Sequence, residues 1–256
     1  MIAAPKPQDE AMDSITPYEP TTLRCALSKA SNFGWHLVEG NLCELADALS
    51  DVAGDRQTSA PSIRVVRSRS SDDAVKVLRP LSQEEAHPRS LSAQYGYEPF
   101  PFHTDGAHLQ SPPDFMLLAA KQDDAGESPT HLKRLWEPPP PANDDDMRRG
   151  VFRVGAGRRS FYITCQSADG RIRFDPGCMA PIDPRSRRLA AAIRTGEPDY
   201  SHRWTRSGEI LIVDNTRVMH ARGRVGDFSR RALYRVLLST VPLWRAYTSL
   251  ERNRRN

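Results

Sequence analysis

The chain has 256 residues, 38% of them hydrophobic and 27% charged, which is the composition of an ordinary globular protein and not of a disordered or fibrous one. Its formal net charge of +4 would suit an acidic ligand, but no basic block is interleaved with aromatic residues, so we expect no nucleic-acid partner. No apolar run approaches the roughly 20 residues that span a bilayer, and no signal peptide is recognisable, so we expect a cytoplasmic protein without a membrane partner.

The first half of the chain is expected to begin with an arm and to continue into helices and strands. Residues 1–20 are rich in Pro, Asp, Glu and Thr, which predicts a flexible N-terminal arm before a single domain over residues 21–256. Apolar spacing after the arm predicts one or two short helices, the second of which stops at Gly54. "SIRVVRSR" (62–69) then predicts a strand, and "PPDFMLLAAKQ" (112–122) predicts a buried strand.

The second half of the chain alternates between turns and apolar runs. Residues 136–150 predict a loop, because four prolines followed by three aspartates do not continue a helix or a central strand, and their place suits a lid over a site. Residues 151–183 alternate around an Asp-Gly turn and predict a hairpin. "DPRSRRLAAAIRTG" (183–196) has an Asp cap, an early Pro and a closing Gly, and predicts a helix. Residues 208–223 and 230–241 predict two strands.

The order of these elements favours one fold class. Many short strands, few helices between them and frequent Pro and Gly turns are typical of a sandwich or jelly-roll barrel and not of a doubly wound α/β fold. The sequence contains no G-x-G-x-x-G dinucleotide fingerprint and no G-x-x-x-x-G-K phosphate loop. We therefore expect a mainly β protein with flanking helices (α+β).

The stretch "PFHTDGAH" (101–108) indicates a metal site. Side chains two apart on extended chain point the same way, so His103 and Asp105 can meet one ion from one face. A third ligand should be an imidazole, and His220 is favoured because it ends an apolar strand and begins a small basic turn. The other histidines considered for the site are His36, His87, His108, His131 and His202.

Two histidines and one carboxylate leave three coordination positions open on an ion, which is the arrangement of non-haem Fe(II) oxygenases. The open positions would take a bidentate 2-oxo acid and then O2. A dicarboxylic co-substrate also needs a buried cation for its far end, and an arginine offers two parallel charge-assisted hydrogen bonds. Arg231 and Arg235, four residues apart, lie on one face of the last predicted strand.

With these residues in place, the sequence resembles the Fe(II)/2-oxoglutarate-dependent dioxygenases of the taurine dioxygenase and clavaminate synthase superfamily. The resemblance covers most of the chain after residue 77. It is closest to the clavaminate synthase-like amino-acid hydroxylases, and the segments that carry it are "SLSAQYGYEPFPFHTDGAH", "IRFDPGCMAPID", "GEILIVDNTRVMHARGRV" and "RRALYRVLL". It implies a double-stranded β-helix (jelly-roll) of the clavaminate synthase-like type.

The resemblance also implies roles for individual residues. His103, Asp105 and His220 match the iron ligands, which are the catalytic centre. Arg231, eleven residues after His220, matches the arginine that holds the distal carboxylate of 2-oxoglutarate. Thr130 matches the threonine whose hydroxyl binds the same carboxylate, although its local sequence "GESPT" departs from the usual Gly-Asp-Thr.

Two further residues are implied to contact the substrate. Arg235 matches a second arginine that orients either 2-oxoglutarate or an acidic group of the substrate. Asp175, in "RFDPGCM", lies where the amino-acid hydroxylases bind an amino or guanidino group; the alternative is that it only forms an Asp-Pro-Gly turn. The implied reaction hydroxylates, desaturates or cyclises a small molecule, most simply an amino acid or an amino-acid-derived metabolite, with release of succinate and CO2.

Three alternatives stay open at the level of sequence. A taurine dioxygenase-like enzyme would oxidise a sulfonate or a carboxylate. A zinc-dependent hydrolase could use the same ligands with a bound water, but it would have no use for Arg231. A non-catalytic binding protein could carry a degenerate site on the same fold. The sequence leaves the oligomeric state open.

Overall fold

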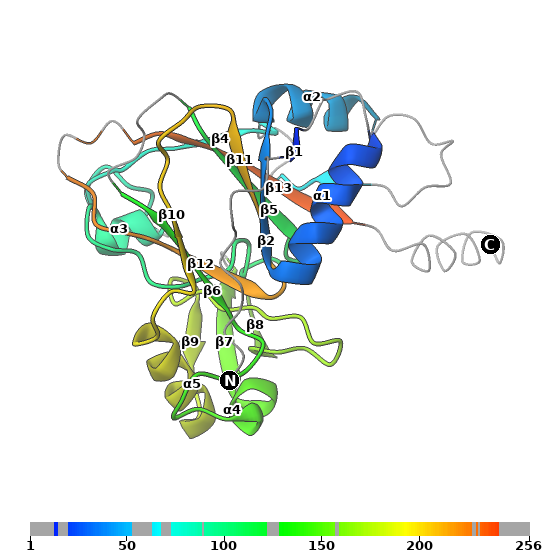
Figure 1. Ribbon diagram of the computed structural model, residues 1–256. Helices are drawn as coiled ribbons and strands as arrows, with labels where there is room; N and C mark the ends of the chain where they lie inside the picture. The colour runs from blue at the N-terminus through cyan, green and yellow to red at the C-terminus, as the bar shows by residue number, and fades with distance from the viewer. Residues whose placement is uncertain are drawn as a thin grey trace.

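The computed structural model describes residues 13–14, 20–52, 63–67, 73–88, 90–121, 128–156, 159–226, 229 and 231–240 (Figure 1). Most of the arm predicted over residues 1–20, and Gly54 as the predicted helix stop, lie outside these residues. None of the described helices is long and apolar enough to cross a lipid bilayer.

A seven-stranded sheet forms the centre of the molecule. Its strands, in spatial order, are β1 (Asp13–Ser14), β2 (Trp35–Glu39), β11 (Glu209–Asp214), β5 (Phe115–Ala120), β13 (Leu233–Thr240) and β3 (Ile63–Val65), with β4 (Lys76–Leu78) also paired to β13. All pairs are antiparallel except β1 with β2. Every residue of β5 and β11 is buried, because both faces of this sheet are covered. The predicted strands at 62–69, 112–122 and 230–241 are confirmed as β3, β5 and β13.

Two helices cover one face of the large sheet. They are α1 (Pro20–Phe33) and α2 (Leu42–Val52), and their apolar faces pack on side chains such as Phe115, Leu117, Ile210 and Ile212 (Figure 1). The predicted helical region is interrupted by strand β2, which the sequence did not reveal. Helix α1 ends because Gly34 adopts φ 97°, and a Cβ there would lie 2.8 Å from Val218 Cγ2.

A three-stranded sheet covers the other face of the large sheet. It consists of β10 (Tyr200–His202), β6 (Thr130–Arg134) and β12 (Val218–Arg222) in that order. The two sheets enclose an apolar layer to which both contribute, made of Met116, Leu118, Ala120, Leu132, Trp204, Leu211, Val213, Val218 and Leu233. This is a β-sandwich, so the expectation of a mainly β protein with flanking helices is confirmed.

The single strand predicted over residues 208–223 is wrong, because the chain turns in its middle. The Asp214 carboxylate accepts hydrogen bonds from the backbone N–H and hydroxyl of Thr216, at 2.9 and 2.6 Å, which closes a turn after β11. The chain then continues as β12 in the opposite sheet. The turn therefore connects the central strand β11 to β12, the strand that contains His220.

A third sheet and two helices form the end of the molecule below the sandwich in Figure 1. The sheet order is β8 (Arg159–Thr164), β7 (Val151–Ala156) and β9 (Met179–Pro181). A hairpin is present as predicted, but it joins β7 to β8, and the Asp-Gly turn closes only a bridge between Gln166 and Ile172. The chain then returns along β7 as β9.

The described residues contain three further helices, which are α3 (Leu91–Tyr95), α4 (Asp144–Arg149) and α5 (Pro184–Arg194). Helix α5 confirms its predicted Asp183 cap and early proline. Helix α4 corrects the second part of the loop predicted over 136–150, whereas residues 136–143 contain no helix or strand, as predicted. Asn143 caps it in a reciprocal capping box with Asp146, and the run of aspartates that we interpreted as a helix breaker lies in its first turn, where carboxylates are stabilised by the helix dipole.

Candidate active site

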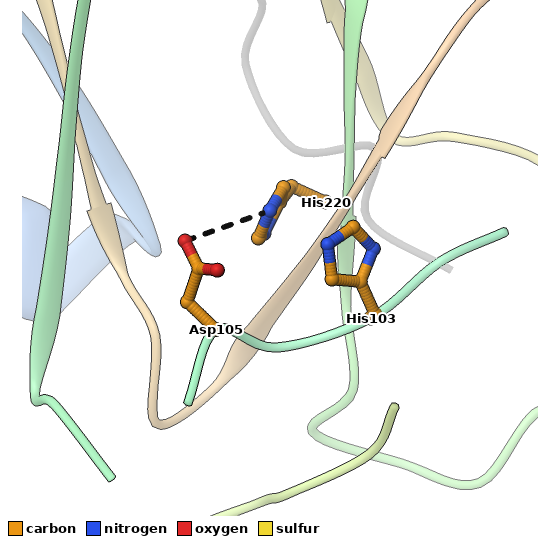
Figure 2. A group of neighbouring side chains, drawn as sticks. All are labelled: His103, Asp105 and His220. Atoms are coloured by element: carbon orange, nitrogen blue, oxygen red, sulfur yellow. Dashed lines mark ion pairs between the residues drawn. The ribbon is translucent and has the colours of Figure 1, made fainter. Parts of the chain in front are cut away.

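The structure brings His103, Asp105 and His220 together between the sheets (Figure 2). His103 and His220 exchange two backbone hydrogen bonds of 2.9 Å, and their ring centroids lie 4.2 Å apart. One ligand atom from each of the three residues lies within 4.8 Å of the others, and all three residues are buried. A cluster assembled from positions 103, 105 and 220 can therefore hold one ion.

Each of the three side chains keeps an atom available for a metal. His103 Nδ1 lies 2.9 Å from the carbonyl oxygen of Pro101, so Nδ1 carries the proton and Nε2 keeps its lone pair. Asp105 Oδ1 accepts from Arg235 Nη1 at 2.7 Å, while Oδ2 is buried, makes no hydrogen bond within the described chain and lies 3.9 Å from His220 Nε2. Buried polar atoms left without a hydrogen bond call for a ligand, and this donor set suits Fe(II).

The electrostatics of the cluster favour the protonation states that bind metal. Burial, together with the neighbouring His103, lowers the pKa of His220 to about 3, so its imidazole is neutral. Burial by itself would raise the pKa of Asp105, but the Arg235 guanidinium, with the two imidazoles, outweighs it and lowers that pKa. A neutral imidazole and an ionised carboxylate are the ligating forms.

Asn215 fixes the backbone of Asp105. Its side-chain oxygen accepts from the Asp105 N–H at 2.8 Å, and its side-chain nitrogen donates to the carbonyls of Asp105 and Pro113 at 3.0 and 2.9 Å. Asn215 is buried and belongs to the turn between β11 and β12. This one side chain thus links the loop that carries Asp105 to the turn that precedes His220.

Asn215→Ala is expected to lower Fe(II) affinity by about 10- to 100-fold, because the Asp105 carboxylate loses its fixed direction. Anaerobic titration calorimetry would measure this. The matched control is Asn41→Ala, which removes the side chain that caps the start of α2 and should reduce stability without changing metal affinity. Equal metal affinity in both variants would show that Asn215 does not position Asp105.

Arg231 and Thr130 lie together on the inner side of the sandwich. Arg231 donates from Nε to the carbonyl of Ser128 and from Nη2 to the hydroxyl of Thr130, both at 3.2 Å. Burial lowers the pKa of Arg231 to about 10, so the guanidinium keeps its charge at neutral pH. No carboxylate of the described residues pairs with it, which leaves a buried cation ready for an anionic ligand.

Arg235 and Asp175 already have hydrogen-bond partners in the structure. Arg235 pairs with Asp105, and its Nε is buried without a partner among the residues that the structure covers. Asp175 accepts from the Gly177 N–H at 2.8 Å and from Cys178 Sγ at 3.5 Å, which is the turn-forming role considered as its alternative. Its neighbour Phe174 exchanges hydrogen bonds with Thr104, so Asp175 still lies near the metal loop.

Sequence reasoning missed Arg222, which is buried on the same face of β12 as His220. It donates from Nη2 to the carbonyls of Gly96 and Glu98 at 2.6 and 2.8 Å, and its guanidinium lies 3.7 Å from the ring centroid of Phe100. Burial lowers its pKa to about 10. The signal was available, since residues two apart on a strand share a face.

His202, which the sequence analysis considered as a ligand, lies away from the metal cluster in β10. Its ring packs edge-on against Trp204 with centroids 4.3 Å apart, and burial lowers its pKa to about 4 although Glu209 Oε2 is 3.6 Å from Nε2. In the unfolded chain the imidazole of His202 has a pKa of about 6.5. Below that pH the unfolded chain binds a proton at His202, whereas the folded chain keeps this imidazole neutral. Stability is therefore lost as the pH falls through the interval between these two values.

We expect the free energy of unfolding to fall between about pH 6.5 and pH 4 by up to about 1.4 kcal/mol per pH unit from this residue alone. Urea unfolding of wild type and His202→Gln at pH 7, 6 and 5 would measure it, with the exposed His108→Gln as the control. Some dependence should remain in His202→Gln, because burial also lowers the pKa of His220. The same slope in His202→Gln as in wild type would assign the effect to other groups.

Comparison with known proteins was made on sequence and on structure. No protein-family model matches the sequence. Among solved structures, asparagine oxygenase in complex with Fe(II), hydroxyasparagine and succinate matches with a TM-score of 0.58 and 17% identity, over 88% of this chain and 81% of its own. PvcB, described as an Fe, alpha-ketoglutarate dependent oxygenase from an isonitrile synthetic pathway, matches with 0.60 and 19%, over 91% and 86%.

A third solved structure has the same architecture. The non-heme iron oxygenase OrfP, in complex with Fe, succinate and (3S)-hydroxy-L-Arg, matches with a TM-score of 0.60 and 16% identity, over 90% of this chain and 84% of its own. At these identities the likeness shows that the chain shares the fold of these oxygenases. The fold extends over nearly the whole of each protein, so the similarity is not confined to the metal motif.

Proposed function

We propose that the protein is a non-haem Fe(II)/2-oxoglutarate-dependent oxygenase in which His103, Asp105 and His220 hold the iron. The observation that carries the proposal is the convergence of these three buried side chains, with Asp105 Oδ2 and a ring nitrogen of each histidine left over for an ion. Three protein ligands leave room for a bidentate co-substrate and O2. The fold shared with iron oxygenases supports this assignment.

Arg231 and Thr130 are proposed to hold the distal carboxylate of 2-oxoglutarate. Their 3.2 Å contact and the absence of a paired carboxylate among the described residues suit a ligand that brings its own negative charge. A zinc hydrolase would gain nothing from such a buried cation, and burial of an unpaired charge is costly to keep without a function. This favours the oxygenase over the hydrolase and over a non-catalytic binding protein.

When bound, Fe(II) with 2-oxoglutarate and O2 supplies the oxidising power for attack on a C–H bond, with release of succinate and CO2. The chain contributes the setting for that chemistry. The Pro101 carbonyl fixes the tautomer of His103, and Arg235 keeps the Asp105 carboxylate ionised. The apolar layer between the two sheets excludes water from the side of the site that faces the core.

The substrate is proposed to be a small molecule, either an amino acid or a metabolite derived from one. Asparagine oxygenase and OrfP, which share the fold, were solved with hydroxylated asparagine and hydroxylated arginine. Asp175 could receive an amino or guanidino group, and the unpaired Nε of Arg235 could receive a carboxylate. That same Nε also suits the sulfonate or carboxylate substrate of a taurine dioxygenase-like enzyme.

The architecture proposed for this enzyme is one domain over residues 21–256, with a double-stranded β-helix (jelly-roll) core formed by the two facing sheets. The arm over residues 1–20 precedes it. Residues 136–150 are proposed as a lid whose helical part, α4, is anchored to α5 by the Asp146–Arg188 ion pair at 2.6 Å. Trp136, half exposed at the start of this segment, would be its moving tip.

The decisive experiment is an anaerobic titration of purified protein with Fe(II) and 2-oxoglutarate. The chelate gives a weak visible charge-transfer band, which a hydrolase or an empty scaffold would not produce. Aerobic reactions with each of the common amino acids would then be screened for succinate release and for a substrate mass gain of one oxygen. No visible band with wild type would refute the proposed function.

A further inference from the structure

Thr130 receives two hydrogen bonds on its hydroxyl oxygen. Arg231 Nη2 donates to it at 3.2 Å, and Trp204 Nε1 donates to it at 3.0 Å. A hydroxyl has two acceptor lone pairs and one proton. Both lone pairs of the Thr130 hydroxyl are in use. The hydroxyl can therefore make a further hydrogen bond only by donating its proton.

Trp204 is held rigidly for this contact. It is completely buried in the apolar layer between the two sheets, and the ring of His202 packs against it at an interplanar angle of 84°. A phenylalanine would fill most of the same space. What the tryptophan adds is an N–H, a donor without acceptor capacity, and Thr130 Oγ1 is its hydrogen-bond partner.

We infer that Trp204 is a positioning residue for the co-substrate: its indole N–H fixes the Thr130 hydroxyl so that the proton is offered to the distal carboxylate of 2-oxoglutarate. The inference rests on the proposed function. Without the indole donor, the hydroxyl can rotate and turn a lone pair towards the incoming anion, which repels it. With the indole donor in place, the Thr130 hydroxyl already has its binding orientation before 2-oxoglutarate arrives. Binding therefore costs less conformational entropy.

The contact between Trp204 and Thr130 also leaves the charge of Arg231 available. The guanidinium is tied down by Ser128 and Thr130, and Trp204 completes the polar set at Thr130 without adding a second charge. An acidic side chain in its place would neutralise Arg231 and compete with the ligand. A neutral donor leaves the full positive charge for an anion.

The test compares 2-oxoglutarate dissociation constants, measured from the charge-transfer band under anaerobic Fe(II), in four proteins: wild type, Trp204→Phe, Thr130→Val and the double variant. Trp204→Phe should weaken binding by about tenfold, and Thr130→Val by at least as much. Because Trp204 acts through Thr130, the double variant should bind no more than about twofold worse than Thr130→Val. Affinity for Fe(II) alone should be unchanged in all four.

Steady-state kinetics gives an independent readout. Trp204→Phe should raise KM for 2-oxoglutarate and leave kcat close to wild type, since the metal centre is untouched. Trp35→Phe is the matched control, because Trp35 lies in the same sandwich, stacked on Tyr200, away from Thr130. If Trp204→Phe does not fold, replacing Trp204 by 3-benzothienylalanine removes the N–H and keeps the ring shape.

The outcomes separate this inference from the proposed function. Wild-type affinity in Trp204→Phe, an unchanged dissociation constant in Thr130→Val, or losses that simply multiply in the double variant would each overturn the positioning role, while binding that still depends on Arg231 would leave the oxygenase intact. Failure of wild type to bind 2-oxoglutarate would overturn both.

Discussion

His220→Ala is expected to lower the affinity for Fe(II) by more than about 100-fold and to abolish succinate formation, because it removes one of three protein ligands outright. The remaining pair, His103 and Asp105, comes from one short loop and supplies only two of the three proposed ligands. Anaerobic calorimetry with Fe(II), and with Mn(II) as a redox-stable substitute, would measure the loss.

The matched control for this variant is His108→Ala, which removes an exposed imidazole from the same loop as His103. It should bind metal like wild type. The backbone bridge between residues 103 and 220 does not involve the imidazole, so His220→Ala is expected to stay folded, as circular dichroism would show. Full succinate formation in His220→Ala would mean that the third ligand is another residue.

The convergence of the three proposed metal ligands could be predicted from sequence, because each of them leaves a local signal. His103 and Asp105 are two apart on extended chain, and His220 follows an apolar run. The expectation that His220 ends a strand at a turn was wrong, because the turn lies at residues 215–217 and His220 lies inside β12. The β-sandwich that brings them together belongs to the mainly β class that the number of short strands favours. These patterns are local in the sequence and can be recognised without knowing which distant residues are in contact. The proposed ligands could therefore be predicted from the sequence alone.

The contacts that refine the site could not be predicted. Whether Arg235 lies against Asp105 or against a ligand depends on side-chain positions across the sandwich, 130 residues apart in the sequence. The same holds for Trp204 and Thr130, 74 residues apart. Two elements were predicted incorrectly for local reasons. The aspartates before Met147 form the first turn of α4 because Asn143 caps the helix. The apolar run over 208–223 is interrupted because Asp214 forms a turn with Thr216.

Arg231→Met is expected to weaken 2-oxoglutarate binding by about 100-fold and leave Fe(II) binding unchanged. Methionine fills similar space without charge, so the distal carboxylate loses the buried cation that is proposed to bind it. Arg231→Lys should be intermediate, because an ammonium keeps the charge but not the two-pronged geometry. The charge-transfer band, titrated with 2-oxoglutarate under anaerobic conditions, would rank the three proteins.

A second measurement on Arg231→Met tests the physical reason itself. The buried guanidinium pairs with no carboxylate of the described chain, and its pKa is lowered because burial opposes its charge. Removing such a charge is expected to leave the free energy of unfolding of the ligand-free protein unchanged or higher, while the gain in stability that 2-oxoglutarate gives wild type disappears. Arg224→Gln, which breaks an exposed pair with Glu98 at 3.1 Å, is the control and should change neither quantity appreciably. Tight 2-oxoglutarate binding in Arg231→Met would place the carboxylate elsewhere, with Arg222 as the next cation to replace.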